Sequence, residues 1–416
     1  MNHLMARLTL FKNPAFSLYL FSCLIASLAN GLSYIGMSWM TVTLSPSFSA
    51  IIGLMLSFWT PNIILGPLAG VLAEQYRKKW LLFFSTVLRA ACLLFFAATY
   101  SFHLHTSFTS LYLLAFFLGT LFALYQPASI AFIREILPQE KLLYANSTID
   151  ISYEVGGLIG MGIAGFIIAF TSFSTVFMIT GILFLFAGTA LILIQKKWIC
   201  YQISQQGKRL RIIKDFTDSL SYLSANKNLI LIYTAQLFLL TQIMLMPALL
   251  APFAKNILHT NAQEFGYIEA MLSTGAIIGS FFIPWAADRF GSIKIAHFLL
   301  LLLAAAFFMF SNVSSITTAK LLYFLIGFGF ALWPILLTIA QRKTDFKFQA
   351  RVYSCFNSIA GVIILGTYIL LYLGGQIISI RNIYLIQFFF CILALGLLWF
   401  GRKNLITHEK VGNRYA

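Results

Sequence analysis

The sequence has 416 residues, of which 60% are hydrophobic and only 10% are charged, and its formal net charge at pH 7 is +16. So few charged side chains cannot cover a water-exposed surface, which excludes a soluble enzyme or binding module and predicts a chain lying mostly within a lipid bilayer. The excess of basic residues would indicate a nucleic-acid or acidic partner in a soluble protein. Here its distribution along the chain indicates membrane topology instead.

Twelve apolar stretches are each long enough to cross the hydrocarbon core as a helix, which takes roughly 20 residues. They span 14–43, 49–73, 79–100, 107–133, 143–170, 173–195, 229–255, 263–287, 292–311, 316–341, 347–376 and 381–402. The predicted fold class is therefore an all-α membrane protein with twelve transmembrane helices. Hydrophobicity falls between them once, which predicts six-helix bundles at 1–195 and 229–402, a linker at 196–228 and a tail at 403–416.

The lysines and arginines are distributed unevenly between the two sides of this arrangement. If the N-terminus is cytoplasmic, all 28 except Lys255, Lys320 and Arg381 belong to cytoplasmic segments or to helix ends on that side. The positive-inside rule then places both termini in the cytoplasm. We expect a monomer in the bacterial inner membrane, with the bilayer as partner and no nucleic acid. Within the linker, apolar residues at helical spacing from Lys208 to Leu223 predict an amphipathic helix on the membrane face.

One loop sequence occurs twice. Residues 66–79 join the second and third apolar stretches, and residues 280–293 repeat the pattern between the eighth and ninth, with Asp288 in the place of Glu74. Pro127 in the fourth stretch and Pro334 in the tenth form a second pair at nearly the same offset. Two repeated features at nearly the same offset predict two halves related as parallel repeats.

The first copy resembles the loop between helices two and three of major facilitator transporters, whose usual form is Gly-x-Leu-Ala-Asp-Arg-x-Gly-Arg-Arg. The matching residues are Gly70, Leu72, Ala73, Lys78 and Lys79. Glu74 replaces the aspartate, and Gln75 and Arg77 depart from the arginine and glycine, whereas the second copy restores all three with Asp288, Arg289 and Gly291. The resemblance implies two bundles that rock about a central cavity. It also implies a gating loop, formed by Gly66, Gly70, Glu74, Arg77, Lys78, Asp288 and Arg289.

The fifth stretch carries two acidic residues within a membrane span. Asp150 and Glu154 are four residues apart and so share one helix face, which continues through Met161 and Gly165. Intramembrane carboxyl groups are costly and tend to be functional, and a poorly hydrated cavity would let one of them hold a proton near neutral pH. Both are candidate proton-coupling residues. The alternative is that Asp150 is simply solvated and Glu154 pairs with a base such as Arg89.

Small residues cover another face of the same helix. Gly156 and Gly160 form a strip suited to close helix packing. The run from Gly156 to Gly165 resembles the glycine-rich fifth-helix motif of major facilitator antiporters, with Met161 where that motif has proline, and the resemblance implies export.

Further segments resemble one bacterial branch of the family, that of siderophore and drug exporters, and in particular enterobactin exporters. They are 11–16, the Asn-Gly-Leu-Ser-Tyr run beginning at Asn30, Pro127-Ala128, 134–138 and Ala145-Asn146. That branch commonly has aspartate where this chain has Asn30.

Isolated polar residues elsewhere in the apolar stretches are candidates for contact with a substrate. Asn30 serves either an interhelical hydrogen bond or a substrate, and Gln236 and Gln242 could hydrogen-bond a polar molecule. Glu264 is expected to be exposed, whereas Glu269 could face an outward vestibule. The cavity candidates are Asn30, Tyr34, Gln126, Gln236, Gln242, Glu269 and Asn357.

Signatures of catalysis or of a cofactor are missing from the sequence. It contains no P-loop, nucleophile elbow or dinucleotide fingerprint, and its five cysteines and six histidines have no metal-ligand spacing. We therefore expect no enzyme, metal or cofactor, and a proton gradient as the energy source. The predicted function is proton-coupled export of a small amphipathic molecule. The alternatives are import of a siderophore or lysophospholipid, and a non-transporting sensor or assembly subunit.

Overall fold

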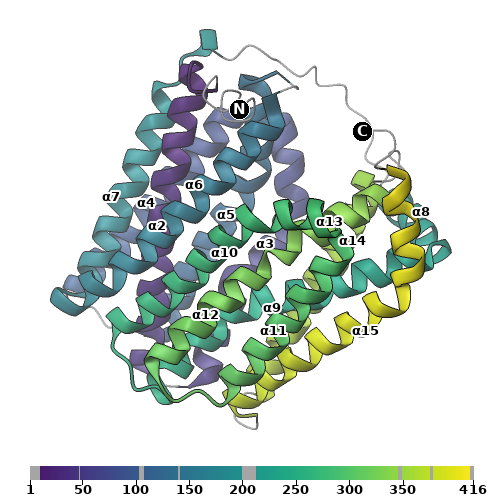
Figure 1. Ribbon diagram of the computed structural model, residues 1–416. Coiled ribbons are helices and arrows are strands. Elements are labelled where there is room, and N and C mark those ends of the chain that lie inside the picture. The colour runs from purple at the N-terminus through teal and green to yellow at the C-terminus, as the bar shows by residue number, and fades with distance from the viewer. Residues whose placement is uncertain are drawn as a thin grey trace. The chain divides into compact units, whose positions relative to one another are not determined.

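The computed structural model describes residues 10–45, 47–102, 107–138, 141–198, 212–344, 349–374 and 378–412, which are almost entirely helical (Figure 1). The first helices are α2 (Pro14–Leu44), α3 (Phe48–Gln75), α4 (Lys78–Ser101), α5 (Phe108–Ile136), α6 (Leu142–Phe170), α7 (Phe173–Leu193) and the short η2 (Lys196–Trp198). The later ones are α8 (Ile212–Ala225), α9 (Lys227–Asn256), α10 (Ala262–Phe290), α11 (Ser292–Ser311), α12 (Ile316–Phe330), α13 (Leu332–Lys343), α14 (Gln349–Gly374) and α15 (Ile380–Gly412).

Twelve spans among the described residues are long and apolar enough to cross a membrane, which confirms the predicted all-α, multi-pass architecture. Hydrogen bonds within each helix satisfy the backbone groups that hydrocarbon cannot, so a chain of this composition has little choice of secondary structure. Polar side chains cap some of the helix ends. Asn13 caps α2 by accepting from the backbone N–H groups of Ala15 and Phe16, at 2.9 and 3.3 Å.

The chain folds into two compact units. The first consists of residues 1–207 together with 254–270, and the second of 208–253 together with 271–416. Residues 254–270 comprise the end of α9, the turn after it and the beginning of α10, and we call this segment the 254–270 hairpin. It belongs to the first unit by its contacts, although the helices that carry it continue into the second.

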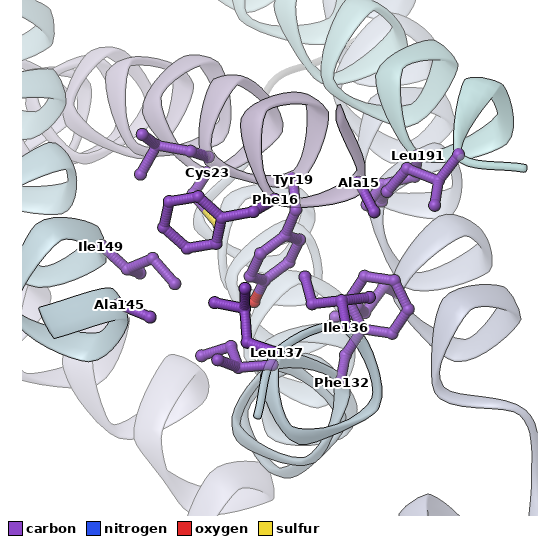
Figure 2. Packing of buried hydrophobic residues seen from close by; sticks show 14 of the residues in the cluster. Ala15, Phe16, Tyr19, Cys23, Phe132, Ile136, Leu137, Ala145, Ile149 and Leu191 are labelled. Atoms are coloured by element: carbon purple, nitrogen blue, oxygen red, sulfur yellow. The ribbon is translucent and has the colours of Figure 1, made fainter. Parts of the chain in front are cut away.

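The first unit is centred on the packing of α2 against α6 and α7, of α3 against α5, and of α4 against α7 and α5. Figure 2 shows one apolar cluster of this unit, in which Phe16, Tyr19 and Cys23 of α2 lie among Phe132 and Ile136 of α5, with residues of α6 beside them. The Tyr19 hydroxyl, buried in the cluster, forms a hydrogen bond of 2.5 Å with Ser129 Oγ. Burial of the phenol is therefore compensated by a polar partner.

The contact between α2 and α6 depends on glycine. A Cβ atom at Gly156 would lie 2.6 Å from the carbonyl oxygen of Leu24, and one at Gly160 would overlap the carbonyl oxygen of Leu28. Gly31 faces α6 in the same way, because its Cβ would lie 2.5 Å from the carbonyl oxygen of Gly157. The predicted role of Gly156 and Gly160 in close packing is confirmed, and this contact sets which face of α6 remains outside it.

The second unit contains a helix break that periodicity did not predict. The tenth apolar stretch is divided at Ala331, between α12 and α13, where the Ala331 N–H bonds to the carbonyl of Phe328 at 3.2 Å. Pro334 explains the break, since it has no N–H for the carbonyl of Phe330 and its ring crowds that group. The linker helix α8 lies where the amphipathic pattern runs, and α15 continues as a helix to Gly412.

Candidate functional site

The acidic residues of α6 lie outside its contact with α2. The side chains of Asp150 and Glu154 are both exposed in the isolated chain. Gly165 lies about three turns after Glu154 on the same helix face, and there a Cβ atom would be 2.5 Å from the carbonyl oxygen of Ala262. The face that carries Glu154 is therefore the face on which the 254–270 hairpin packs further along.

The structure brings together two residues that the sequence analysis selected from distant positions. The hydroxyl of Tyr34 on α2 donates a hydrogen bond of 2.7 Å to Oε1 of Glu269 at the end of the hairpin. Glu269 is 4% exposed, and no basic side chain among the described residues forms an ion pair with it. Asn30, one helical turn before Tyr34, is half-buried. A buried carboxyl group beside a phenol can hold a proton or a positively charged ligand group.

Glu264, on the same hairpin, has a different role. Its carboxylate accepts from the backbone N–H of Asn261 at 3.0 Å, while Asn261 Oδ1 accepts from the backbone N–H of Glu264 at 2.9 Å. This reciprocal pair is a capping box at the beginning of α10. Glu264 therefore stabilises the helix end. Glu269 is the buried acidic group of the hairpin, and helix capping does not account for it.

Arg89 does not pair with Glu154 in the described structure. It is 2% exposed, and its guanidinium lies 4.6 Å from the ring centroid of Tyr125 and 5.2 Å from that of Phe184. Its Nε donates to the carbonyl of Ser85 at 3.2 Å. The two aromatic faces stabilise the buried cation in place of a carboxylate. The alternative in which Arg89 neutralises Glu154 therefore has no support from this geometry.

The glutamines of α9 lie inside the second unit. Gln242 donates from Nε2 to the backbone carbonyl of Gln387 at 3.2 Å and to Sγ of Cys391 at 3.3 Å. Gln236 is 0% exposed, and neither polar atom of its side chain has a hydrogen-bond partner among the described residues. An unpaired buried amide is destabilising, so Gln236 needs an explanation that Gln242 does not.

Replacing Gln236 by methionine tests whether this buried amide destabilises the folded protein. We expect Gln236→Met to raise the free energy of unfolding by about 1–3 kcal/mol, because a similarly long apolar side chain removes an unsatisfied group. Thermal unfolding in detergent measures the change. Gln242→Met is the matched control and should gain nothing, since it loses the hydrogen bonds to Gln387 and Cys391. A destabilised Gln236→Met protein would show that the amide has a partner, such as buried water.

The two remaining cavity candidates have exposed side chains. Gln126 lies on α5 of the first unit, and Asn357 lies on α14 of the second. No described contact connects either of them to Tyr34 or Glu269. Their assignment to a substrate cavity remains a prediction.

The gating-loop residues are described in part. Lys78 Nζ lies 3.3 Å from Oε1 of Glu135, so the beginning of α4 forms an ion pair with the end of α5. Arg77, Asp288 and Arg289 are exposed, and Arg289 lies beside the ring of Trp285 at 5.7 Å. The Glu74 side chain and the surroundings of Gly66 and Gly70 lie outside what the structure describes.

Exchanging the charges of the Lys78–Glu135 pair tests its role. We expect Lys78→Glu to place two carboxylates about 3–4 Å apart and so separate α4 from the end of α5, and the double variant Lys78→Glu, Glu135→Lys to restore the contact. Thiol labelling of single cysteines introduced beside the loop measures the change. Equal labelling of all three proteins would argue against a gating role.

Several residues that position the hairpin were not selected from the sequence. Trp39 stacks on Phe265 with ring centroids 5.3 Å apart, and Lys255 Nζ lies 5.2 Å from the centroid of Trp39. Aromatic residues fill so much of this chain that no sequence signal distinguishes these two. A sequence signal did mark Lys255, which is one of the few basic residues that the predicted topology places outside the cytoplasm.

Known proteins resemble this chain over nearly its whole length. The family model of the Major Facilitator Superfamily matches residues 19–362 and, overlapping these, residues 229–413. An uncharacterized MFS-type transporter of Bacillus subtilis (strain 168), YfiS, is 24% identical over 170 residues. That match covers 41% of this chain and 39% of YfiS, so the chain matches well under half of that relative's length.

Two solved structures share the fold. The nucleoside transporter NupG superposes with a TM-score of 0.69 at 16% identity, covering 93% of this chain and 98% of NupG. A bacterial homologue of the human lysosomal transporter Spinster, solved in an inward-facing and unoccupied conformation, gives a TM-score of 0.69 at 14% identity, covering 95% of this chain and 98% of that one. At such low identities the likeness establishes the helical architecture and no substrate.

Proposed function

This chain belongs to the Major Facilitator Superfamily and is a membrane-embedded secondary transporter rather than an enzyme, and from that premise we propose that it exports a small amphipathic molecule in exchange for protons. Transport would proceed by alternating access, with the proton gradient as the energy source and no cofactor. The siderophore-like or drug-like character of the substrate rests on the resemblance of sequence segments to that exporter branch.

One observation carries the proposal. Glu269 is a carboxyl group within a membrane span, buried, hydrogen-bonded to Tyr34 and without a basic partner among the described residues. Glu154 supports it, because it lies on the α6 face that packs against the same hairpin. Unpaired intramembrane carboxyl groups are costly to retain and are characteristic of proton pathways in transporters. The alternative function, a non-transporting sensor or assembly subunit, does not require a proton pathway.

The distribution of basic residues supports a defined location. A monomer in the bacterial inner membrane, with both termini in the cytoplasm, would have Lys78, Glu135 and the linker on the inner side and the 254–270 hairpin on the outer side. Export then means movement from the Lys78 side to the hairpin side.

Vesicles of opposite orientation test the direction of transport. We expect inverted vesicles with an acidic lumen to accumulate a fluorescent amphipathic drug as protons leave the lumen, to lose the drug when an uncoupler is added, and to do neither without the protein. Accumulation by right-side-out vesicles would instead support import, the alternative for a siderophore or lysophospholipid. A nucleoside and a lysophospholipid are the comparison probes. Drug accumulation that is unchanged by the uncoupler would contradict proton coupling.

A further inference from the structure

The 254–270 hairpin lies directly against the backbone of α6. At Gly165 of α6 a Cβ atom would be 2.5 Å from the carbonyl oxygen of Ala262, and at Gly266 of the hairpin it would be 2.8 Å from the carbonyl oxygen of Met161. Backbone therefore meets backbone at both glycines. Such a close approach fixes the position and rotation of the first turns of α10, and with them the position of Glu269.

Two stacked aromatic rings join the hairpin to α2. Trp39 of α2 and Phe265 of the hairpin are buried and stacked, at an interplanar angle of 22°. The ammonium group of Lys255 lies over the Trp39 ring, 5.2 Å from its centroid. Phe265 is one helical turn before Glu269, so the stacked rings lie directly next to the carboxyl group along α10. The carboxyl group is therefore shielded from water as long as the hairpin stays docked on α2.

Among the described residues, the Glu269 side chain has a hydrogen-bond donor and no cationic ion-pair partner. Tyr34 donates to Oε1 from α2. The titratable and charged groups described on the elements packed here are Tyr19, Cys23 and Tyr34 of α2, Asp150, Tyr153 and Glu154 of α6, and Lys255, His259, Glu264 and Tyr267 of the hairpin. Among the described residues Lys255 lies against Trp39 rather than Glu269, and Glu264 caps its helix. The remaining groups of α6 are acidic or phenolic and cannot neutralise a carboxylate.

This environment discriminates between the two forms of the carboxyl group. An ionised, buried carboxylate needs several compensating donors or a cation, and one phenol hydroxyl does not replace its hydration. The neutral acid carries no such cost, and its carbonyl oxygen can still accept the hydrogen bond from Tyr34. The docked hairpin is thus compatible with a protonated Glu269, whereas exposure to water would allow the proton to leave.

We propose that Glu269 is a proton-binding site whose occupancy is linked to docking of the 254–270 hairpin. The docked hairpin holds one proton on the Glu269 carboxyl group beside Tyr34. Undocking breaks the Tyr34 hydrogen bond, hydrates the carboxyl group and releases that proton to water. The inference rests on the proton-coupled transport proposed above, in that it gives the proton a second location besides Glu154, but it concerns docking and can be tested without a substrate.

Hydrogen–deuterium exchange of the full-length protein in lipid nanodiscs measures docking directly. Protection factors of peptides covering 254–270, corrected for intrinsic exchange at each pH, are compared from about pH 5 to about pH 9. For the wild type we expect protection to fall as the pH rises, by at most about tenfold per pH unit, the limit for release of one proton. In Glu269→Gln, a neutral isostere, protection should stay at its low-pH level throughout.

Two further variants keep the test decisive. Tyr34→Phe retains the carboxyl group, so its protection should be lower overall but should still fall with pH. Glu154→Gln should keep the full wild-type pH dependence even if it abolishes transport, which separates this inference from the proposed function. A wild type without pH dependence in these peptides, or a Glu269→Gln protein that retains it, would overturn the proposal.

Discussion

Replacing Gly160 by leucine is expected to be strongly destabilising to the first unit. Even a Cβ atom at this position would overlap the carbonyl oxygen of Leu28 and lie 3.1 Å from the backbone nitrogen of Leu32. Because the obstacle is backbone, no rotamer change relieves the clash, and α2 must move away from α6. We expect a loss of at least about 3 kcal/mol, the upper part of the usual range for overpacking. Thermal unfolding and the yield of monodisperse protein measure it.

The same helix supplies the control. A Cβ atom at Gly162 would meet nothing within 4 Å, so Gly162→Leu makes the same chemical change without the clash. It should unfold close to the wild-type temperature. If Gly160→Leu were as stable as Gly162→Leu, the close contact between α2 and α6 would be absent from the folded protein.

Replacing Glu154 by glutamine is expected to abolish proton-driven transport while leaving expression and folding intact. The side chain is exposed on α6 and lies away from the glycine contact with α2, so an isosteric amide removes no packing. The amide cannot bind and release a proton, and the substrate gradient should then fall to the level reached with an uncoupler. Uptake by energised inverted vesicles measures the loss.

Asp150→Asn is the matched control for Glu154→Gln. Asp150 lies one turn earlier on the same face and is also exposed, so the two variants make the same change at neighbouring sites. If Glu154 is the coupling group, Asp150→Asn should retain most of the proton-driven transport. Normal transport by Glu154→Gln would exclude Glu154, and loss with both variants would indicate that the two carboxyl groups act as a pair.

Much of the fold could be predicted because membrane helices are specified locally. Length and hydropathy determine each span, since hydrocarbon allows no unpaired backbone group. The strip of Gly156 and Gly160 predicted a close helix contact, which the structure finds against α2. The break at Ala331 was missed because proline at 334 acts on a carbonyl four residues earlier, and prolines elsewhere, such as Pro127, lie within continuous helices. Whether neighbours accommodate the freed carbonyl is a matter of packing.

The candidate site shows where sequence reasoning ends. The spacing of Asp150 and Glu154 placed them on one helix face, because that follows from helical geometry alone. Tyr34 and Glu269 could each be selected as polar residues in apolar stretches, but no pattern indicated that they meet. Arg89 was considered as an ion-pair partner for Glu154, but its guanidinium lies against the rings of Tyr125 and Phe184.

The sequence by itself determined that this chain is a twelve-span membrane protein, which of its residues are polar within the spans, and which faces of α6 are acidic or small. Only the tertiary structure decided that Tyr34 donates to Glu269, that Glu269 is buried and that Glu264 serves its helix end. The physical reason is that the position of a residue within a helix depends on near neighbours in the chain, whereas the partner of a polar side chain depends on which helices approach most closely. In this protein a few glycines on α2, α6 and the 254–270 hairpin set that approach.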